Sequence, residues 1–253
     1  MNNQIYIPFL LTLLAGLSTV VGSMIFLSHK FRKKEHIGFF LGLSAGVMIY
    51  LSFIELLPYS IKHIGFLSTN VYFFIGIIVM ALLDFFIPHN YLEEKMCRTE
   101  NVVDRKLLST GFMVTLGLII HNIPEGIAVF LSSLTDIKLG MLLAIAITIH
   151  NIPEGIAVAA PIYHATLSKA KAIKYAFISG MAEPIGAIAA YFLLKPYLNL
   201  GILSYIFALV AGIMVYISFD ELLPACFRDD YGHRAILGIV IGMIIVSLSL
   251  ILL

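Results

Sequence analysis

The sequence is short of charge, of cysteine and of tryptophan. Only 12% of its 253 residues are charged, about half of the roughly 25% that is usual for soluble domains, and 60% are hydrophobic. A soluble chain of this size would need far more polar surface to cover its core, and a disordered chain would be far less hydrophobic. Two cysteines exclude a disulfide scaffold, and a net charge of +1 gives no basis for binding nucleic acid. The composition therefore indicates an integral membrane protein.

Long apolar runs divide the chain into eight candidate membrane spans. A spanning helix needs about 20 predominantly apolar residues. Such runs lie at approximately 5–28, 37–57, 70–88, 107–132, 139–161, 173–195, 200–222 and 235–253. The connecting segments are short, so we expect an all-α integral membrane protein whose residues 1–253 form one transmembrane domain in contact with the lipid bilayer.

The basic residues of the connections predict the orientation of these spans. Thirteen lysines and arginines lie in the connections 1–2, 3–4, 5–6 and 7–8, whereas the opposite side has only Lys62, Lys138 and Lys195. Basic residues concentrate in cytoplasmic segments. We therefore expect a multi-pass protein of the plasma membrane with both termini outside. Cys97 and Cys226 would then face the reducing cytoplasm as free thiols.

Two internal repeats relate helices that run in opposite directions. The nonapeptide His121–Val129 (HNIPEGIAV) recurs without change at His150–Val158, pairing helix 4 with helix 5. The segment Leu43–Pro58 (LSAGVMIYLSFIELLP) matches Leu209–Pro224 (LVAGIMVYISFDELLP), pairing helix 2 with helix 7. Because both helix separations are odd, the pattern predicts an inverted-topology repeat in a 3+2+3 arrangement. In transporters of this kind the substrate site lies near the membrane midplane, at interrupted helices.

Polar residues in the middle of helices 4, 5 and 6 predict a bound cation. A carboxylate at the centre of a bilayer costs roughly 2.5–3.5 kcal/mol. Glu125, Glu154 and Glu183 lie at that depth, and no lysine or arginine in the spans lies there to neutralise them. The alternative is a network of hydrogen bonds between helices with protonated glutamates. The duplication of the whole set favours a cation.

The spacing of the polar residues gives one ligand set. His121 and Glu125 are separated by four residues and share a helix face with Asn122, and helix 5 repeats this arrangement. Pro124, Pro153 and Pro184 are expected to loosen the helices at the site. Nitrogen and oxygen ligands without thiolate suit Zn²⁺, Fe²⁺, Mn²⁺ or Cd²⁺. The predicted metal ligands are His121, Asn122, Glu125, His150, Asn151, Glu154 and Glu183, enough for two adjacent ions.

Further carboxylates lie nearer the helix ends. The topology places Glu55 at the outer end of helix 2, Asp220 and Glu221 at the inner end of helix 7, and Asp84 near the inner end of helix 3. The repeat relates Glu55 to Glu221, so these two are candidates for a cation pathway. The alternative is that such carboxylates simply reach water at the interface, and this is our interpretation of Asp84 and Asp220.

The duplicated HNIPEG motif in an eight-span chain resembles the ZIP family of divalent-metal transporters, most closely its bacterial members. The flanking segments SFIELLP, HNIPEGIAVAAPIY, SGMAEP and SFDELLP fit the same family, so the resemblance covers essentially the whole chain. It implies metal uptake into the cytoplasm through a central, often binuclear, site. One ion would be held by Glu125, His150 and Glu154 with His121 nearby, and the other by Asn122, Glu125, Asn151, Glu154 and Glu183. The connection between helices 3 and 4 departs from the family in having only one histidine, His89.

Other functions remain open from the sequence. An intramembrane zinc hydrolase would need a general base, but asparagine occupies the position after each motif histidine, so we do not expect an enzyme. A structural metalloprotein or sensor would hold its metal without exchange. Channel and carrier are not distinguished, and the same ligands serve several metals. Small residues are compatible with a homodimer, although no GxxxG pair singles out one helix face.

Overall fold

The structure is a computed structural model that describes residues 3–28, 36–86, 103, 105–193, 199–227 and 232–252. Within these residues every element is a helix, and eight helical segments are long and apolar enough to cross a membrane. The prediction of an all-α membrane protein with eight spans is therefore confirmed. Cys97 and most basic residues of the connections lie outside the described residues, whereas Cys226 is a buried free cysteine.

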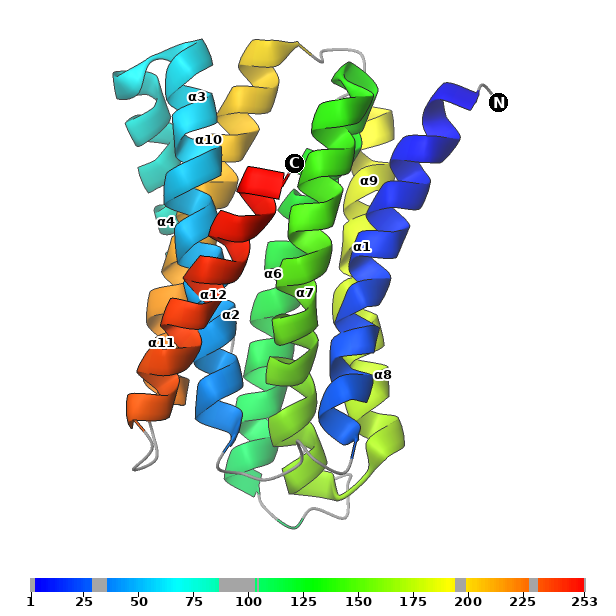
Figure 1. The fold of residues 1–253 in the computed structure, drawn as a ribbon, viewed down its shortest axis with the longest axis vertical. Coiled ribbons are helices and arrows are strands. Elements are labelled where there is room, and N and C mark those ends of the chain that lie inside the picture. The colour runs from blue at the N-terminus through cyan, green and yellow to red at the C-terminus, as the bar shows by residue number, and fades with distance from the viewer. Residues whose placement is uncertain are drawn as a thin grey trace.

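Five spans are single α-helices and three are interrupted (Figure 1). The single helices are α1 (Asn3–Leu27), α4 (Phe66–Phe86), α6 (Arg105–Thr135), α7 (Ile137–Thr166) and α12 (Gly232–Leu252). The interrupted spans are α2 (Ile37–Leu51) with α3 (Leu57–Ile64), α8 (Lys169–Gly180) with α9 (Ala182–Leu193), and α10 (Leu200–Ile217) with α11 (Leu223–Cys226). A π-helical turn joins the first pair (Ser52–Leu56) and the third pair (Ser218–Leu222), so both copies of the longer repeat contain one.

The second span is longer than the sequence predicts. It extends to Ile64, well past the expected end at residue 57. Pro58 does not end it, because proline is tolerated in the first turn of a helix and here occupies the first turn of α3. The placement of Glu55 at the outer end of helix 2 is therefore wrong. Glu55 lies in the π-helical turn, well inside the span.

Two of the three prolines act differently from expectation. Pro124 lies inside the continuous helix α6, and Pro153 lies inside the continuous helix α7. Each proline removes only one amide donor, and the neighbouring turns remain helical because both helices are packed against others along their length. Pro184 agrees with the expectation, because the sixth span is interrupted three residues before it, at Met181 between α8 and α9.

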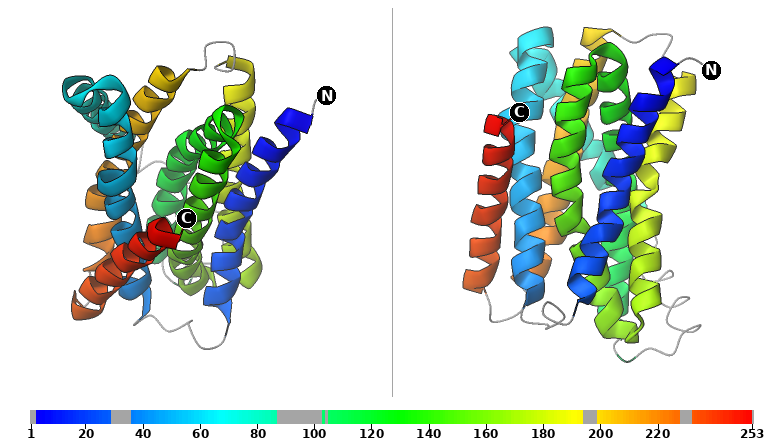
Figure 2. Two further views of the ribbon diagram at one scale, coloured as in Figure 1. Left: turned by 45° about the horizontal axis from the view of Figure 1, so that its top comes forward. Right: turned by 45° about the vertical axis from the view of Figure 1, so that its right-hand side comes forward.

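The helices form two groups that meet at the two central helices. One group consists of α1, α6, α7, α8 and α9, in which α1 packs along α7 and α9 packs along α6. The other consists of α2, α3, α4, α10, α11 and α12, in which α12 packs along α2 and α10 packs along α4. The groups touch where α2 meets α7 and where α10 meets α6 (Figures 1 and 2).

Close backbone contacts in the second group occur in related pairs. At each one, a side chain in place of a glycine would overlap a carbonyl oxygen of the neighbouring helix. Four of these contacts form two pairs, in which the two glycines are 166 positions apart and so are their two partner residues, the same offset that separates the two copies of the longer repeat. The pairs are Gly76 on Leu209 with Gly242 on Leu43, and Gly46 on Ile239 with Gly212 on Phe73.

The chain termini lie toward the same end of the bundle (Figures 1 and 2). The ends of α1 and α7 and the starts of α2, α6, α8 and α12 lie at the opposite end, and these helix ends flank the four basic connections (Figure 1). The connection between α6 and α7 is the single residue Asp136, whose carboxylate accepts a hydrogen bond from the Lys138 amide at 2.8 Å. This tight cap holds the two motif-bearing helices antiparallel and adjacent.

Candidate metal site

The two copies of the repeated motif face each other near the middle of α6 and α7. Because residues i and i+4 lie on one helix face, each helix presents its histidine and glutamate together. The seven predicted ligands are all buried, with at most 1% of any side chain exposed. They are His121, Asn122 and Glu125 on α6, His150, Asn151 and Glu154 on α7, and Glu183 on α9.

Two histidines and two glutamates form a compact cluster. The Nε2 atom of His121 lies 3.2 Å from Glu125 Oε1 and 3.3 Å from Glu154 Oε1. The Nε2 atom of His150 lies 3.2 Å and 3.1 Å from the same two oxygens, and the two Nε2 atoms are 3.4 Å apart. Within the described part of the chain, the ion pairs of these glutamates are all with these histidines.

These separations match those of four ligands around one small cation. Zinc forms bonds of about 2.0–2.1 Å to imidazole nitrogen and about 2.0–2.2 Å to carboxylate oxygen, in a tetrahedral arrangement. The edge of such a tetrahedron is about 1.6 times the bond length, or about 3.3–3.5 Å. The five distances in the cluster, 3.1–3.4 Å, lie at or just below that value. His121, His150 and Glu154 also meet a geometric criterion for a metal-binding group on their own.

The two asparagines are fixed by their amide nitrogens, which leaves their oxygens free. Asn122 Nδ2 donates to the Ser179 carbonyl at 3.0 Å and to its hydroxyl at 3.3 Å. Asn151 Nδ2 donates to the Ala15 carbonyl at 2.8 Å and to Glu183 Oε1. The Oδ1 atoms of both asparagines are buried and have no hydrogen-bond partner.

Unpartnered oxygens are concentrated in this part of the molecule. Besides the asparagine Oδ1 atoms, the second carboxylate oxygens of Glu125, Glu154 and Glu183 are buried without a hydrogen-bond partner. Buried polar atoms are normally paired, and each exception needs an explanation. Five unpartnered oxygens from three helices are the ligand type preferred by a divalent cation.

The sequence interpretation missed the groups that orient the asparagines. Ser179 on α8 and the Ala15 carbonyl on α1 hold the amide groups of Asn122 and Asn151. Ser179 lies four residues before Glu183 in the segment SGMAEP, so its position on the same helix face was visible in the sequence. Ala15 acts through its backbone, and no side-chain pattern indicates it.

The candidate pathway carboxylates lie outside the cluster. Glu221, in the π-helical turn after α10, places its carboxylate against Gly117 on α6, one helical turn before His121. Its Oε2 atom is buried without a hydrogen-bond partner. Glu55 occupies the corresponding π-helical turn after α2 and is partly exposed. Asp84 lies near the end of α4, as predicted.

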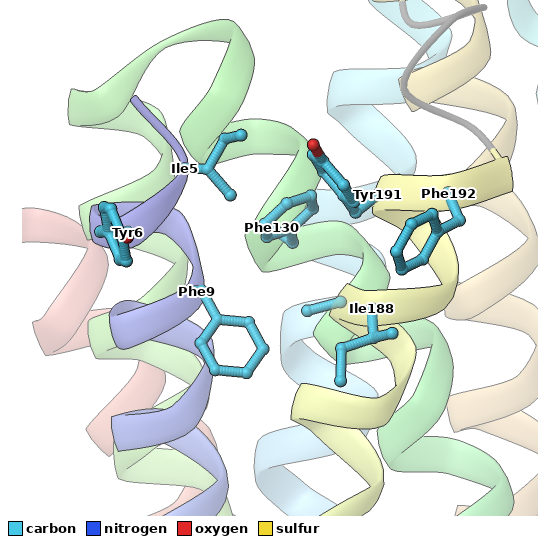
Figure 3. Close-up of a pocket in the computed structure, with 8 residues that line it drawn as sticks. Ile5, Tyr6, Phe9, Phe130, Ile188, Tyr191 and Phe192 are labelled. Atoms are coloured by element: carbon cyan, nitrogen blue, oxygen red, sulfur yellow. The ribbon is translucent and has the colours of Figure 1, made fainter. Parts of the chain in front are cut away.

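A separate pocket of about 350 Å³ lies between α1, α6 and α9, and it is apolar (Figure 3). Phe9, Phe130 and Ile188 point into it, and Tyr191 and Phe192 lie at its edge (Figure 3). None of the metal-ligand candidates lines this pocket. Its aromatic and aliphatic walls suit contact with lipid chains, and it has no ligand for a cation.

The fold and the cluster together define a polytopic membrane protein with a buried cluster of imidazole, carboxylate and amide groups. Residues 88–250 match the family model described as ZIP Zinc transporter. The chain is 47% identical to the zinc transporter ZupT of Streptococcus mutans, with 100% of this chain and 99% of that protein aligned. It is 46% identical to the zinc transporter ZupT of Oceanobacillus iheyensis, with both chains aligned in full, and 46% identical to that of Chlorobium limicola over 98% of each.

The chain therefore belongs to the ZIP family of zinc transporters. The resemblance carried by the duplicated motif is confirmed. Zinc is the transported substrate, and the family consists of transporters rather than enzymes, in agreement with the asparagines that follow the motif histidines.

Proposed function

We propose that the protein takes up zinc from outside the cell into the cytoplasm through a binuclear site between α6, α7 and α9. The spacing of the histidine and glutamate cluster carries this proposal. Four buried ligand atoms separated by 3.1–3.4 Å fit one tetrahedral ion without rearrangement of the helices. The positive charge of the ion replaces the lysine or arginine that the buried carboxylates lack.

The free oxygens support a second ion beside the first. Glu125 and Glu154 would use one oxygen for each ion and so bridge them. The second ion would complete its shell with Glu183 Oε2 and the amide oxygens of Asn122 and Asn151, all of which are buried and unpartnered. Because every ligand is oxygen or nitrogen, we propose iron(II), manganese(II) and cadmium as further substrates.

The positive-inside rule supports the orientation of the pathway, and the resemblance to the family supports transport toward the cytoplasm. With the basic connections in the cytoplasm, Glu221 lies on the cytoplasmic side of the cluster and Glu55 on the outer side. We propose that both carboxylates lie on the cation pathway, because the repeat relates them and Glu221 reaches α6 one turn from His121. The odd helix separations of both repeats support an inverted repeat whose halves move relative to each other.

Zinc flux into liposomes that contain the purified protein tests the proposal. The wild type should fill the vesicles. The double variant Glu125→Ala/Glu154→Ala should lose uptake to the level of empty vesicles, because it removes both bridging carboxylates. Cys226→Ser is the matched control, since this buried thiol lies outside the cluster and its replacement should leave uptake unchanged.

The same preparations distinguish the other outcomes. Uptake by the double variant equal to that of the wild type would exclude the central site. Stoichiometric zinc binding by the wild type without flux or exchange would instead favour a structural metal or a sensor. Competition of zinc flux by iron(II), manganese(II) and cadmium measures which of them share the site.

A further inference from the structure

The contacts between α1 and α7 have the same pattern as the contacts between α9 and α6. The backbones of Gly16 on α1 and Gly180 on α8 approach each other reciprocally. Gly155 on α7 lies against the Thr19 carbonyl, and Gly126 on α6 lies in the same way against the Glu183 carbonyl. Gly126 and Gly155 are equivalent positions of the nonapeptide repeat.

Two further pairs follow the same relation. Gly22 lies against Ile152, and Gly186 lies against Ile123, again at equivalent positions of the repeat. Asn151 donates to the Ala15 carbonyl, and Asn122 donates to the Ser179 carbonyl. In every pair the residue of α1 and its counterpart in α8 or α9 differ by 164 positions. The contacts of α1 therefore correspond to those of the sixth span (α8 and α9), although the sequence shows no repeat between these two spans.

This relation makes Thr19 the counterpart of Glu183. Glu183 reaches across to α7, where its Oε1 accepts a hydrogen bond from Asn151. Thr19 occupies the equivalent place on α1, on the side of the site that belongs to Asn122. Its side chain is 0% exposed, and its hydroxyl has no hydrogen-bond partner. The Oδ1 atom of Asn122 is likewise buried and unpartnered.

The other serine and threonine hydroxyls of α1 contrast with that of Thr19. Thr12 donates to the Pro8 carbonyl at 2.9 Å, Ser18 to the Ala15 carbonyl at 2.6 Å, and Ser23 to the Val20 carbonyl at 2.7 Å. A threonine in a helix commonly bonds in this way to the carbonyl three or four residues earlier. Thr19 forms no such bond, so its hydroxyl is available to a ligand.

We propose that Thr19 is a further residue of the cation site and that its hydroxyl binds a water molecule of the bound zinc opposite Glu183. A threonine hydroxyl is two heavy atoms shorter than a glutamate carboxylate, so an intervening water completes the reach to the ion. The two sides of the site would then differ. On one side the Glu183 carboxylate of α9 would bind the ion, and on the other side a water molecule bound by the Thr19 hydroxyl of α1 would do so. This proposal rests on the proposed metal site between α6, α7 and α9.

Thr19→Val tests the proposal because it keeps the shape of the side chain and removes only the hydroxyl. Zinc binding to the detergent-purified protein and the KM of zinc uptake by liposomes are measured together. Thr19→Val should weaken binding and raise KM about two- to tenfold, the effect of one lost hydrogen bond to a water molecule, with the maximal rate within about twofold. Thr19→Ser should restore both values, and Thr12→Val should leave both unchanged.

Replacing Thr19 by a residue with a carboxylate gives a second, independent test of its role in zinc binding. Thr19→Asp should bind zinc about tenfold more tightly and release it more slowly, because a direct ligand replaces the water. This variant and Thr19→Ser decide the question even if Thr19→Val is not recovered as a monodisperse protein. Wild-type affinity in Thr19→Asp, or in a folded Thr19→Val, would overturn the role of Thr19. Unchanged binding by Glu125→Ala/Glu154→Ala would instead overturn the metal site itself.

Discussion

At the scale of single residues, the site depends on side chains that orient the ligands as much as on the ligands. Asn122 can offer its amide oxygen to a cation only because Ser179 accepts both contacts of its amide nitrogen. Asn151 is oriented in the same way by the Ala15 carbonyl and by Glu183. Such supporting contacts commonly change metal affinity strongly when they are removed.

Ser179→Ala isolates one of these contacts. It removes the hydroxyl that Asn122 Nδ2 reaches at 3.3 Å and leaves the stronger bond to the carbonyl at 3.0 Å. We expect zinc affinity to fall about two- to fivefold, consistent with a loss of about 0.5–1 kcal/mol. Ser132→Ala, on the same helix as Asn122 but bonded only to the Ala128 carbonyl, is the control in the same titration. Equal affinity of Ser179→Ala and the wild type would show that the carbonyl alone orients Asn122.

At the scale of helices, glycines set how closely the site-bearing helices approach their neighbours. Gly155 brings α7 against the backbone of α1, and Gly126 brings α6 against α9. Without a hydrophobic driving force between helices in a membrane, such close packing supplies much of the attraction. The approach also fixes the distance between the glutamates of α6 and α7 and Glu183 on α9.

Gly155→Val should separate α1 from α7. A Cβ at this position would overlap the Thr19 carbonyl, which belongs to the backbone and cannot turn aside. Overpacking of this kind costs about 1–3 kcal/mol, so we expect the melting temperature in detergent to fall by several degrees and zinc binding to weaken. Gly232→Ala is the control, since its Cβ would meet only the Phe227 ring at 3.6 Å. A Gly155→Val protein as stable as this control would contradict the close-packing explanation.

At the scale of the whole molecule, two groups of helices enclose a polar centre. The orientation of the bundle in the membrane decides which of its ends faces the cytoplasm. The termini lie toward one end of the bundle and the helix ends next to the basic connections lie at the other (Figure 1). Among the described residues, Lys138 is exposed at the start of α7, and Lys169 is exposed at the start of α8, beyond the opposite end of α7. These two positions therefore lie on opposite sides of the membrane.

Labelling of single cysteines in intact cells tests the orientation. In a background with Cys97→Ser and Cys226→Ser, Lys138→Cys should react with an impermeant thiol reagent from outside. Lys169→Cys should react only after the membrane is permeabilised, because basic connections remain in the cytoplasm. Zinc uptake by each variant verifies that the labelled protein is folded. The reverse labelling pattern would place both termini inside and would overturn the proposed orientation, with Glu221 then on the outer side of the cluster.

The number of spans, the two motif helices and the residue types at their centre could be predicted from the sequence alone. Hydropathy over about 20 residues is a local property, and the motif places His121 and Glu125 on one helix face without reference to any other helix. Local patterns could not show that the second span continues beyond Pro58, or that α6 and α7 continue through Pro124 and Pro153, because packing against neighbouring helices decides how a proline is accommodated.

Which groups meet became apparent from the tertiary structure. It brought Nε2 and Oε1 atoms from α6 and α7 to 3.1–3.4 Å, placed Ser179 and the Ala15 carbonyl behind the asparagines, and aligned α1 with α9. The equivalence of Thr19 and Glu183 is visible only in these contacts. The side chains of α1 differ from those of α8 and α9, whereas the close approach of their backbones to α7 and α6 is the same. Close packing constrains the backbone spacing of such helices more tightly than the identity of the side chains that line the site.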